Sequence, residues 1–208
     1  MITDKTHNMG LMDIQNNSNF DTDKQDKHTY LESYEKLFKP YKDKKINILE
    51  IGILDGGSLK LWSMYFTNAK IYGADTFERV SIEDVKINLE GTWWSKTFSD
   101  VELVKFDSAT AGDKDRDNFF NTLRENNILF DIIIDDGSHR WDFQVDTFNN
   151  FKPLLNIGGL YIIEDIWTTD THKYKASNSD EELEKRIDGI EFIRNNKYAN
   201  NTLGIYRK

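Results

Sequence analysis

The sequence has no cysteine and only two prolines among its 208 residues. Without cysteine, disulfide bonds, thiolate metal sites and cysteine nucleophiles are all excluded. Any metal ion bound by this chain must therefore be held by oxygen or imidazole ligands.

Long apolar runs and basic runs are also lacking. No stretch approaches the length of a membrane span, and the N-terminal residues do not form a signal-peptide pattern. The formal net charge is −9, with no basic run of the kind that follows a phosphate backbone. We therefore expect a soluble, cytoplasmic protein with no membrane span and no nucleic-acid partner, while a homo-oligomer stays open.

The apolar content is sufficient for one hydrophobic core. Hydrophobic residues make up 38% of a chain of 208 residues, which is typical of a single globular domain. Residues 1–19 are polar, rich in asparagine and without hydrophobic period, and this pattern predicts a flexible N-terminal tail. We expect one domain over residues 20–208.

The central motif is INILEIGILDGGS, residues 46–58. An apolar run rich in isoleucine meets Gly52, a second pair of glycines follows, and Ser58 begins a segment with apolar residues at helical spacing. This order predicts a strand, a glycine turn that lets the backbone approach a ligand, and a helix. The motif is not G-x-G-x-x-G, so a dinucleotide is not the first choice. Glu50 before Gly52 gives the acid-x-Gly pattern expected for S-adenosylmethionine.

Predicted strands and helices alternate along the rest of the chain. The apolar runs that predict strands after the first are residues 69–75, 101–106, 129–134 and 160–163. Helices are expected over residues 30–38, 58–66, 81–89, 113–126, 141–155 and 180–187, whereas residues 91–98 form a loop of no assigned type. Residues 189–194 and 203–207 predict a terminal antiparallel pair. The chain is therefore expected to form a doubly wound, mostly parallel α/β sheet, of the Rossmann-like kind.

Acidic residues directly follow several of these strands. They are Asp75, Asp107, Asp135, Asp136, Glu164 and Asp165. Because parallel α/β sheets bind ligands at the carboxyl ends of their strands, we expect these carboxylates to meet at one crevice. Each one alone could instead be a helix N-cap. The acid that ends the second strand, Asp75, lies where such folds place a carboxylate against a ribose diol.

Asp136, Glu164 and Asp165 are the candidate metal ligands. Clustered carboxylates repel one another unless a proton or a cation separates them, and ligation by oxygen favours Mg²⁺ or Mn²⁺. Adjacent strand residues point to opposite faces, so Glu164 and Asp165 can both bind an ion only if the strand has ended before them. Otherwise one of these two acids lies behind the other and does not bind the ion directly.

His139 is the candidate general base, because imidazole changes its charge near neutral pH and the residue follows Asp136 by three positions. It could also be a helix-start histidine bonded to a neighbouring carboxylate. His7, His28 and His172 have weaker contexts, although His172 could contact substrate. Tryptophans near the expected crevice suit the faces of a sugar, or they are partly buried core residues: Trp93, Trp94, Trp141 and Trp167.

The motifs LEIGILDGGSLKLWSMYF, DIIIDDGSH and GGLYIIEDI together resemble the metal-dependent class I methyltransferases that O-methylate sugars, such as the macrolide-sugar and rhamnose methyltransferases. The likeness runs from about Phe20 to the C-terminus and includes DKHTYLESYEKLF. Two features depart from the family: Leu54 stands at the usual middle glycine of the cofactor loop, and the additional N-terminal domain of larger members is lacking.

The resemblance implies a role for each motif residue. Glu50, Gly52, Gly57 and Ser58 would line the methionine part of S-adenosyl-L-methionine. Asp75 would hold its ribose, and Asp107 and Ser108 would lie by its adenine. Asp135 would also be a cofactor-binding residue. Asp136, Glu164 and Asp165 would bind Mg²⁺ or Mn²⁺, Asp136 and His139 would be the catalytic residues, and the acceptor would be a sugar or glycan.

Three alternatives to sugar O-methylation remain open. A metal ion can grip a catechol-type diol as it grips a sugar diol. An NAD-dependent oxidoreductase would use a similar fold with a different cofactor, and a sugar- or partner-binding module would lack catalysis.

Overall fold

The computed structural model describes residues 9–18, 20, 22–26, 28–90, 92–93, 96–98, 101–108, 110, 112–168, 179–195 and 201–208. The helices of this part are α1 (Leu11–Asn17), α2 (Asp23–Asp26), α3 (Leu31–Phe38), α4 (Gly57–Tyr65), α5 (Ile82–Leu89), α6 (Lys114–Glu125), α7 (Trp141–Phe151) and α8 (Ser179–Arg186). The strands are β1 (Ile46–Ile51), β2 (Ala69–Asp75), β3 (Thr92–Trp93), β4 (Lys96–Thr97), β5 (Val101–Lys105), β6 (Phe130–Asp135), β7 (Leu155–Ile163), β8 (Glu191–Arg194) and β9 (Thr202–Arg207).

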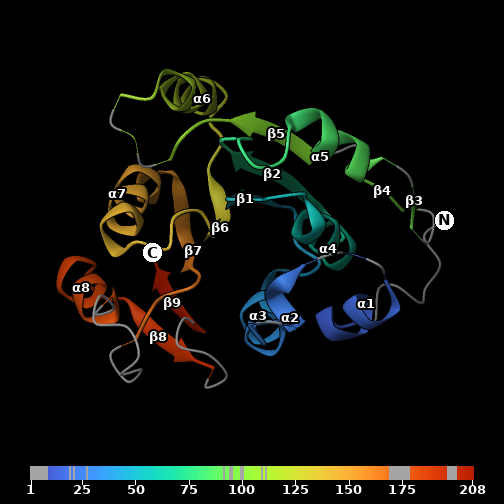
Figure 1. Cartoon of the computed structure of the whole chain (residues 1–208), viewed down its shortest axis with the longest axis horizontal. Helices are drawn as coiled ribbons and strands as arrows, with labels where there is room; N and C mark the ends of the chain where they lie inside the picture. Colours follow the sequence, from blue (N-terminus) through green and yellow to red (C-terminus); the bar gives the residue numbers. More distant parts are fainter. Residues whose placement is uncertain are drawn as a thin grey trace.

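Seven strands form one sheet in the order β5-β2-β1-β6-β7-β9-β8 (Figure 1). The first five of these run parallel to one another. β9 pairs antiparallel with β7, and β8 pairs antiparallel with β9. The mostly parallel, doubly wound sheet with a terminal antiparallel pair is confirmed. β1 and β6 are neighbours at the point where the strand order reverses, which is where open α/β sheets form their ligand crevice.

The isoleucine-rich strands are buried on both faces because helices cover both sides of the sheet. Ile132 and Ile134 of β6 pack in one hydrophobic cluster with residues of α3 and α4, whereas Ile133 packs in the other with residues of α6 and α7. Successive side chains of a strand point to opposite faces, so an unbroken apolar run serves both layers. Figure 1 shows α6, α7 and α8 on one side of the sheet and α3 and α4 on the other.

Several element boundaries differ from the prediction. The helix expected to reach Leu155 ends at Phe151, and β7 begins at Leu155 rather than at Leu160. Residues 91–98, which had no assigned type, contain the short antiparallel pair β3–β4. Two glycines, Gly158 and Gly159, stand before Leu160, so the sequence shows no apolar pattern where β7 begins. The backbone of Leu155 nevertheless already pairs with Phe130 of β6.

Part of the expected N-terminal tail is a helix. In α1, Leu11 and Ile14 are fully buried, and the backbone amide of Leu11 donates to Glu35 Oε2 at 2.5 Å. The prediction of a flexible tail is therefore wrong for residues 11–17. A helix this short has little stability of its own, so its sequence carries little signal, and packing against α3 and α4 stabilises it. The single-domain boundary at residue 20 stays a prediction.

Over the described residues, none of the helices combines the length and the apolar character that crossing a membrane requires.

Candidate active site

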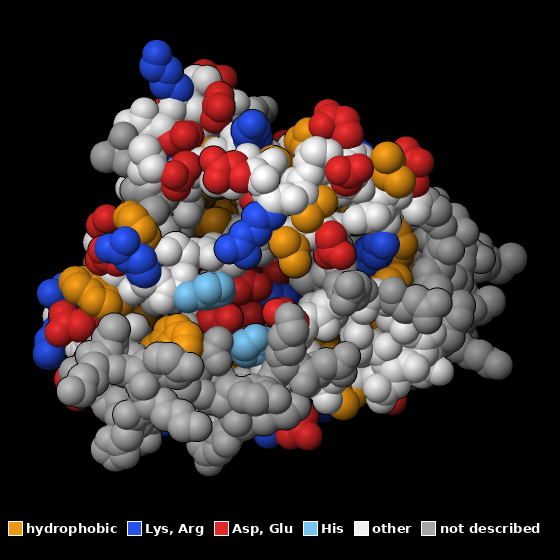
Figure 2. Space-filling model, viewed as in Figure 1, with side chains coloured by type: hydrophobic (Ala, Val, Ile, Leu, Met, Phe, Trp, Pro, Cys, Tyr) orange, Lys and Arg blue, Asp and Glu red, His pale blue; other side chains and the backbone are white. Residues whose placement is uncertain are grey.

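A cleft of about 540 Å³ opens at the carboxyl ends of the parallel strands. Its walls include Asp75, which ends β2, and residues that follow β1, β5, β6 and β7: Gly52, Asp107, Asp136 and Asp165. Figure 2 shows acidic side chains gathered at the centre of this face, with histidines on either side of them. Four of the acids at the strand ends thus line this one cleft: Asp75, Asp107, Asp136 and Asp165. The volume is in the range that binds a small molecule or cofactor.

The glycine turn is shaped by the carboxylate at the end of β2. Asp75 Oδ2 accepts hydrogen bonds from the backbone amides of Ile53 at 2.9 Å and Leu54 at 3.2 Å. Leu54 adopts the left-handed conformation, with φ of 49°, at the position where the resembled family has glycine. The turn therefore keeps a glycine-like backbone without the glycine, and Asp75 is one of the groups that hold it there.

Glu50 lies beneath the turn rather than on the cleft wall. Its Oε2 accepts hydrogen bonds from Ser58 Oγ and Trp62 Nε1, both at 2.8 Å, and the residue has no exposed surface. Burial raises the pKa of the Glu50 carboxyl, and the ammonium of Lys24 opposes that rise. Glu50 therefore anchors the first turn of α4 to β1, while Ser58 reaches the cleft.

The other expected cofactor residues divide in the same way. Asp107 and Ser108 line the cleft, whereas Gly57 and Asp135 are not among its described lining residues. Asp135 is buried under the turn that follows β6, where its Oδ1 accepts from the Gly137 amide at 3.3 Å. Burial raises the pKa of Asp135 to about 8.

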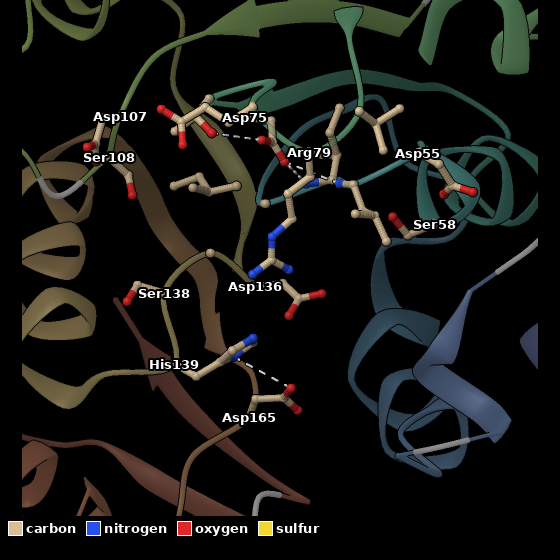
Figure 3. A pocket seen from close by; sticks show the side chains of 18 of the residues that line it. Asp55, Ser58, Asp75, Arg79, Asp107, Ser108, Asp136, Ser138, His139 and Asp165 are labelled. Carbon is tan, nitrogen blue, oxygen red and sulfur yellow. Dashed lines mark hydrogen bonds and ion pairs between the residues drawn. The ribbon is translucent and has the colours of Figure 1, made fainter. Parts of the chain in front are cut away.

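Asp136, His139 and Asp165 form the open part of the site. One potential ligand atom from each lies within 4.8 Å of the other two. His139 Nδ1 is 3.5 Å from Asp165 Oδ2, and Figure 3 shows these side chains turned toward the same space. β7 ends at Ile163 and Asp165 has φ of 54°, so the strand has ended before this pair of acids. The two acids nevertheless belong to different groups of potential ligand atoms, Asp165 with Asp136 and His139, and Glu164 with Glu50 and Asp136.

Glu164 lies behind these residues, against a buried lysine. Lys24 Nζ is 3.2 Å from Glu50 Oε1, 3.0 Å from Asp136 Oδ2 and 2.6 Å from Glu164 Oε1. The hydroxyl of Tyr34 also donates to Glu164. Asp136 and Asp165 therefore face the cleft, whereas Glu164 is 2% exposed and is held by the N-terminal part of the chain.

The electrostatics of the cluster favour a bound cation. Burial and the charge of Asp136 raise the pKa values of Glu164 and Asp165. Lys24 lowers the pKa of Glu164, and His28 and His139 lower the pKa of Asp165. Burial lowers the pKa of Lys24, but the three surrounding carboxylates outweigh burial and raise it well above its usual value. A divalent cation beside these carboxyls would stabilise their ionised forms. Oxygen-rich ligands of this kind fit Mg²⁺ or Mn²⁺.

Sequence reasoning missed the contribution of the N-terminal segment. Lys24, His28, Tyr30 and Tyr34 all contact Asp136, Glu164 or Asp165. The sequence predicted only a helix over residues 30–38, which contains Tyr30 and Tyr34. Two hydroxyls on one buried face were the available signal, because a buried tyrosine hydroxyl usually needs a polar partner.

Of the aromatic candidates, Trp141 is not among the described residues that line the cleft. The ring of Trp141 is covered by the guanidinium of Arg186, whose carbon lies 4.4 Å from the ring centre. His7, Trp94, His172 and the side chain of Trp93 lie outside the described residues.

Gly52 lies in the glycine turn and packs directly against the backbone of the loop that follows β6. Replacing Gly52 by alanine should therefore be severely destabilising. A Cβ at Gly52 would lie 2.2 Å from the carbonyl oxygen of Asp136 and 2.7 Å from Gly137 Cα, at a φ of +83°. Both contacts are to backbone, so one loop must move. We expect Gly52→Ala to lower the free energy of unfolding by about 3 kcal/mol, measured by denaturant titration.

Gly158→Ala is the matched control for this substitution. Gly158 has a similar φ of +79°, but a Cβ there would meet no atom within 4 Å. It should cost only the left-handed backbone strain, about 1 kcal/mol. Equal losses in the two variants would show that the contact between the two loops is unimportant.

No protein-family model matches the chain. In sequence it is similar to curated sugar O-methyltransferases. It is 28% identical over 182 residues to the 8-demethyl-8-alpha-L-rhamnosyl tetracenomycin-C 2'-O-methyltransferase of Streptomyces olivaceus, covering 81% of this chain and 43% of that protein. It is 28% identical over 148 residues to the mycinamicin VI 2''-O-methyltransferase of Micromonospora griseorubida, covering 68% of this chain and 32% of that protein. The chain therefore spans less than half the length of these relatives.

Solved structures share the fold. MycE methyltransferase from the mycinamycin biosynthetic pathway, in complex with Mg, SAH and mycinamycin VI, matches with a TM-score of 0.57 and 22% identity, over 87% of this chain and 50% of that one. A putative caffeoyl-CoA O-methyltransferase from Staphylococcus aureus matches with a TM-score of 0.58 and 20% identity, over 84% and 80%. The fold is that of the class I methyltransferases.

Proposed function

We propose that this chain, a homologue of the sugar O-methyltransferases, transfers a methyl group from S-adenosylmethionine to a hydroxyl of a deoxyhexose such as rhamnose, with a divalent cation. One observation carries the proposal: Asp136, His139 and Asp165 converge in a cleft that the glycine turn also lines. Of the sequence relatives, one is named as a 2'-O-methyltransferase of a rhamnosyl tetracenomycin and another as a 2''-O-methyltransferase of mycinamicin VI. The structural neighbour MycE binds Mg and SAH.

The residues that line the cleft fit both S-adenosylmethionine and a divalent cation. For the cofactor, the turn at Gly52, together with Asp75, Asp107 and Ser108, offers backbone and polar side chains along one side of the cleft. For the cation, Asp136 and Asp165 offer carboxylate oxygens, and Glu164 lies directly behind them. A bound divalent cation lowers the pKa of a hydroxyl that it contacts and so makes an alcohol a better nucleophile.

His139 is placed to take the hydroxyl proton. Its side chain is 47% exposed and lies at the cleft, with Nδ1 3.5 Å from Asp165 Oδ2. A carboxylate next to one ring nitrogen orients the imidazole and stabilises its protonated form, which leaves the other nitrogen, Nε2, to accept the proton from the acceptor. Holding acceptor and methyl donor in line in one cleft supplies the remaining rate gain through orientation.

Ligand binding separates this function from the other candidates. We expect calorimetric titration with S-adenosylhomocysteine to show binding and titration with NADH to show none. With S-adenosylmethionine, Mg²⁺ and a panel of rhamnosides and catechols, a product heavier by one methylene should form on a rhamnoside and disappear in excess EDTA. Binding of NADH alone would indicate an oxidoreductase, methylation of catechols alone would indicate the other diol class, and binding of neither cofactor would favour a non-catalytic module.

A further inference from the structure

The N-terminal segment grips one of the candidate metal ligands by a single hydroxyl. Tyr30 is fully buried, and its hydroxyl donates to Asp165 Oδ1 at 2.8 Å. The same oxygen atom of Tyr30 accepts from the backbone amide of Asp165 at 3.3 Å. One phenol group therefore fixes both the side chain and the main chain of Asp165, from a position 135 residues away in the sequence.

The backbone of Asp165 needs such support. Its φ of 54° is left-handed, a conformation that is strained for a residue with a side chain. The hydrogen bonds to Tyr30 offset part of this strain. Without them, the backbone can relax toward an ordinary conformation, and the carboxylate turns with it.

The two oxygens of Asp165 are divided between the protein and the cleft. Oδ1 is occupied by the Tyr30 hydroxyl, and His28 Nδ1 lies 3.2 Å from the same atom. The ring of His28 stacks on that of Tyr30, with 5.2 Å between the ring centres. Oδ2 is the oxygen that lies near His139. The N-terminal segment thus binds the inner oxygen and leaves the outer one for a ligand.

We propose that Tyr30 is a positioning residue that holds Asp165 Oδ2 toward the cleft, so that a divalent cation can bind there. This inference rests on the proposed function, since it assigns Tyr30 to the cation site of that function. Hydrogen bonds to a ligating carboxylate orient it, and their removal typically costs 10- to 100-fold in metal affinity. Tyr30 itself contacts neither the acceptor nor the methyl donor in this scheme.

The test is Mn²⁺ affinity of the full chain, measured by calorimetry without acceptor, in Tyr30→Phe. The substitution keeps the ring and its packing and removes only the hydroxyl. We expect the dissociation constant for Mn²⁺ to rise about 10-fold. An unchanged dissociation constant would overturn the inference.

Tyr65→Phe is the matched control. Tyr65 is also fully buried, and its hydroxyl donates to Glu35 Oε1 at 2.9 Å, so this substitution removes a comparable hydrogen bond outside the acid cluster. We expect the Mn²⁺ affinity of Tyr65→Phe to match that of the unchanged chain, with a similar drop in melting temperature in both variants. An equal loss of affinity in both would mean that general destabilisation is the cause, and the assignment of Tyr30 would be wrong.

The unchanged chain separates this inference from the function on which it rests. If it binds no Mn²⁺, both the cation-dependent function and the role of Tyr30 fail. If it binds Mn²⁺ and Tyr30→Phe binds equally well, only the role of Tyr30 fails.

Discussion

Replacing Lys24 by methionine should lower the free energy of unfolding by about 3 kcal/mol, the largest loss expected from any single side chain at the site. The substitution keeps an unbranched side chain, one heavy atom shorter, and removes its charge. Lys24 is 1% exposed and lies within 3.2 Å of three carboxylates, two of which are themselves buried. Removing the cation leaves these carboxylates without a counter-charge in a region where water cannot replace it.

The loss of stability in Lys24→Met should increase as the pH rises. Burial already raises the pKa of Glu50 and of Glu164, and Lys24 lowers both values. Without Lys24, the folded-state pKa values move further above those of the unfolded chain. Such groups stabilise the folded state at low pH, and this stabilisation is lost as the pH rises through the folded-state pKa. The deficit of Lys24→Met should therefore be small near pH 4 and grow toward pH 8.

Lys70→Met is the matched control, because Lys70 forms an exposed ion pair with Glu102, with 2.9 Å between nitrogen and oxygen. Pairs of this kind contribute little to stability in water, at most about 1 kcal/mol. Denaturant titration of both variants at several pH values gives the comparison. A loss in Lys24→Met no larger than that in Lys70→Met, or one independent of pH, would show that the carboxylates do not depend on the ammonium.

The acids at the strand ends could be predicted from the sequence because their position is a local consequence of the fold. An apolar run ending in Asp or Glu places the carboxylate at the rim of a parallel sheet. Asp136 and Asp165 thus lie where the pattern put them. Whether such an acid faces the cleft or the interior depends on the alternation of side chains along the strand and on the backbone angles where the strand ends. That is why Glu50 and Glu164, predicted as ligand-binding residues, lie beneath the rim instead.

The partners of those acids could not be predicted in the same way. Lys24 lies in a polar segment with no hydrophobic period, and it is separated from Asp136 by 112 positions. Its burial depends on how α2 packs across the ends of β1, β6 and β7, which is a property of tertiary structure alone. A helix over residues 30–38 could be predicted, but helical period says nothing about where the hydroxyls of Tyr30 and Tyr34 will point.

Asp136→Asn should abolish the proposed methyl transfer without unfolding the chain. The Asp136 carboxylate belongs to both groups of potential ligand atoms, one with His139 and Asp165 and one with Glu50 and Glu164. Asparagine keeps the shape of the side chain but removes its charge, so we expect Mn²⁺ affinity to fall at least about 100-fold. Turnover with S-adenosylmethionine and the acceptor should fall about 1,000-fold, by the loss of the activated hydroxyl.

Although metal affinity and turnover should fall in Asp136→Asn, the stability of this variant should not. The charge of Asp136 raises the pKa values of Glu164 and Asp165, which means that it repels them in the folded chain. Removing that charge relieves the repulsion, although Lys24 loses one of its three partners. We therefore expect the melting temperature of Asp136→Asn without metal to be unchanged or higher. Binding of S-adenosylhomocysteine should stay within about 3-fold, since the turn at Gly52 is held by Asp75 and not by the Asp136 side chain.

His139→Ala distinguishes loss of the cation from loss of the base. A general base contributes about 100- to 10,000-fold to a rate, so turnover of this variant should fall within that range while Mn²⁺ still binds. Turnover of Asp136→Asn that stays high and is still stopped by EDTA would remove Asp136 from the cation site. A loss of Mn²⁺ binding in His139→Ala as complete as that in Asp136→Asn would make His139 a ligand of the cation and leave the proton without the acceptor assigned to it.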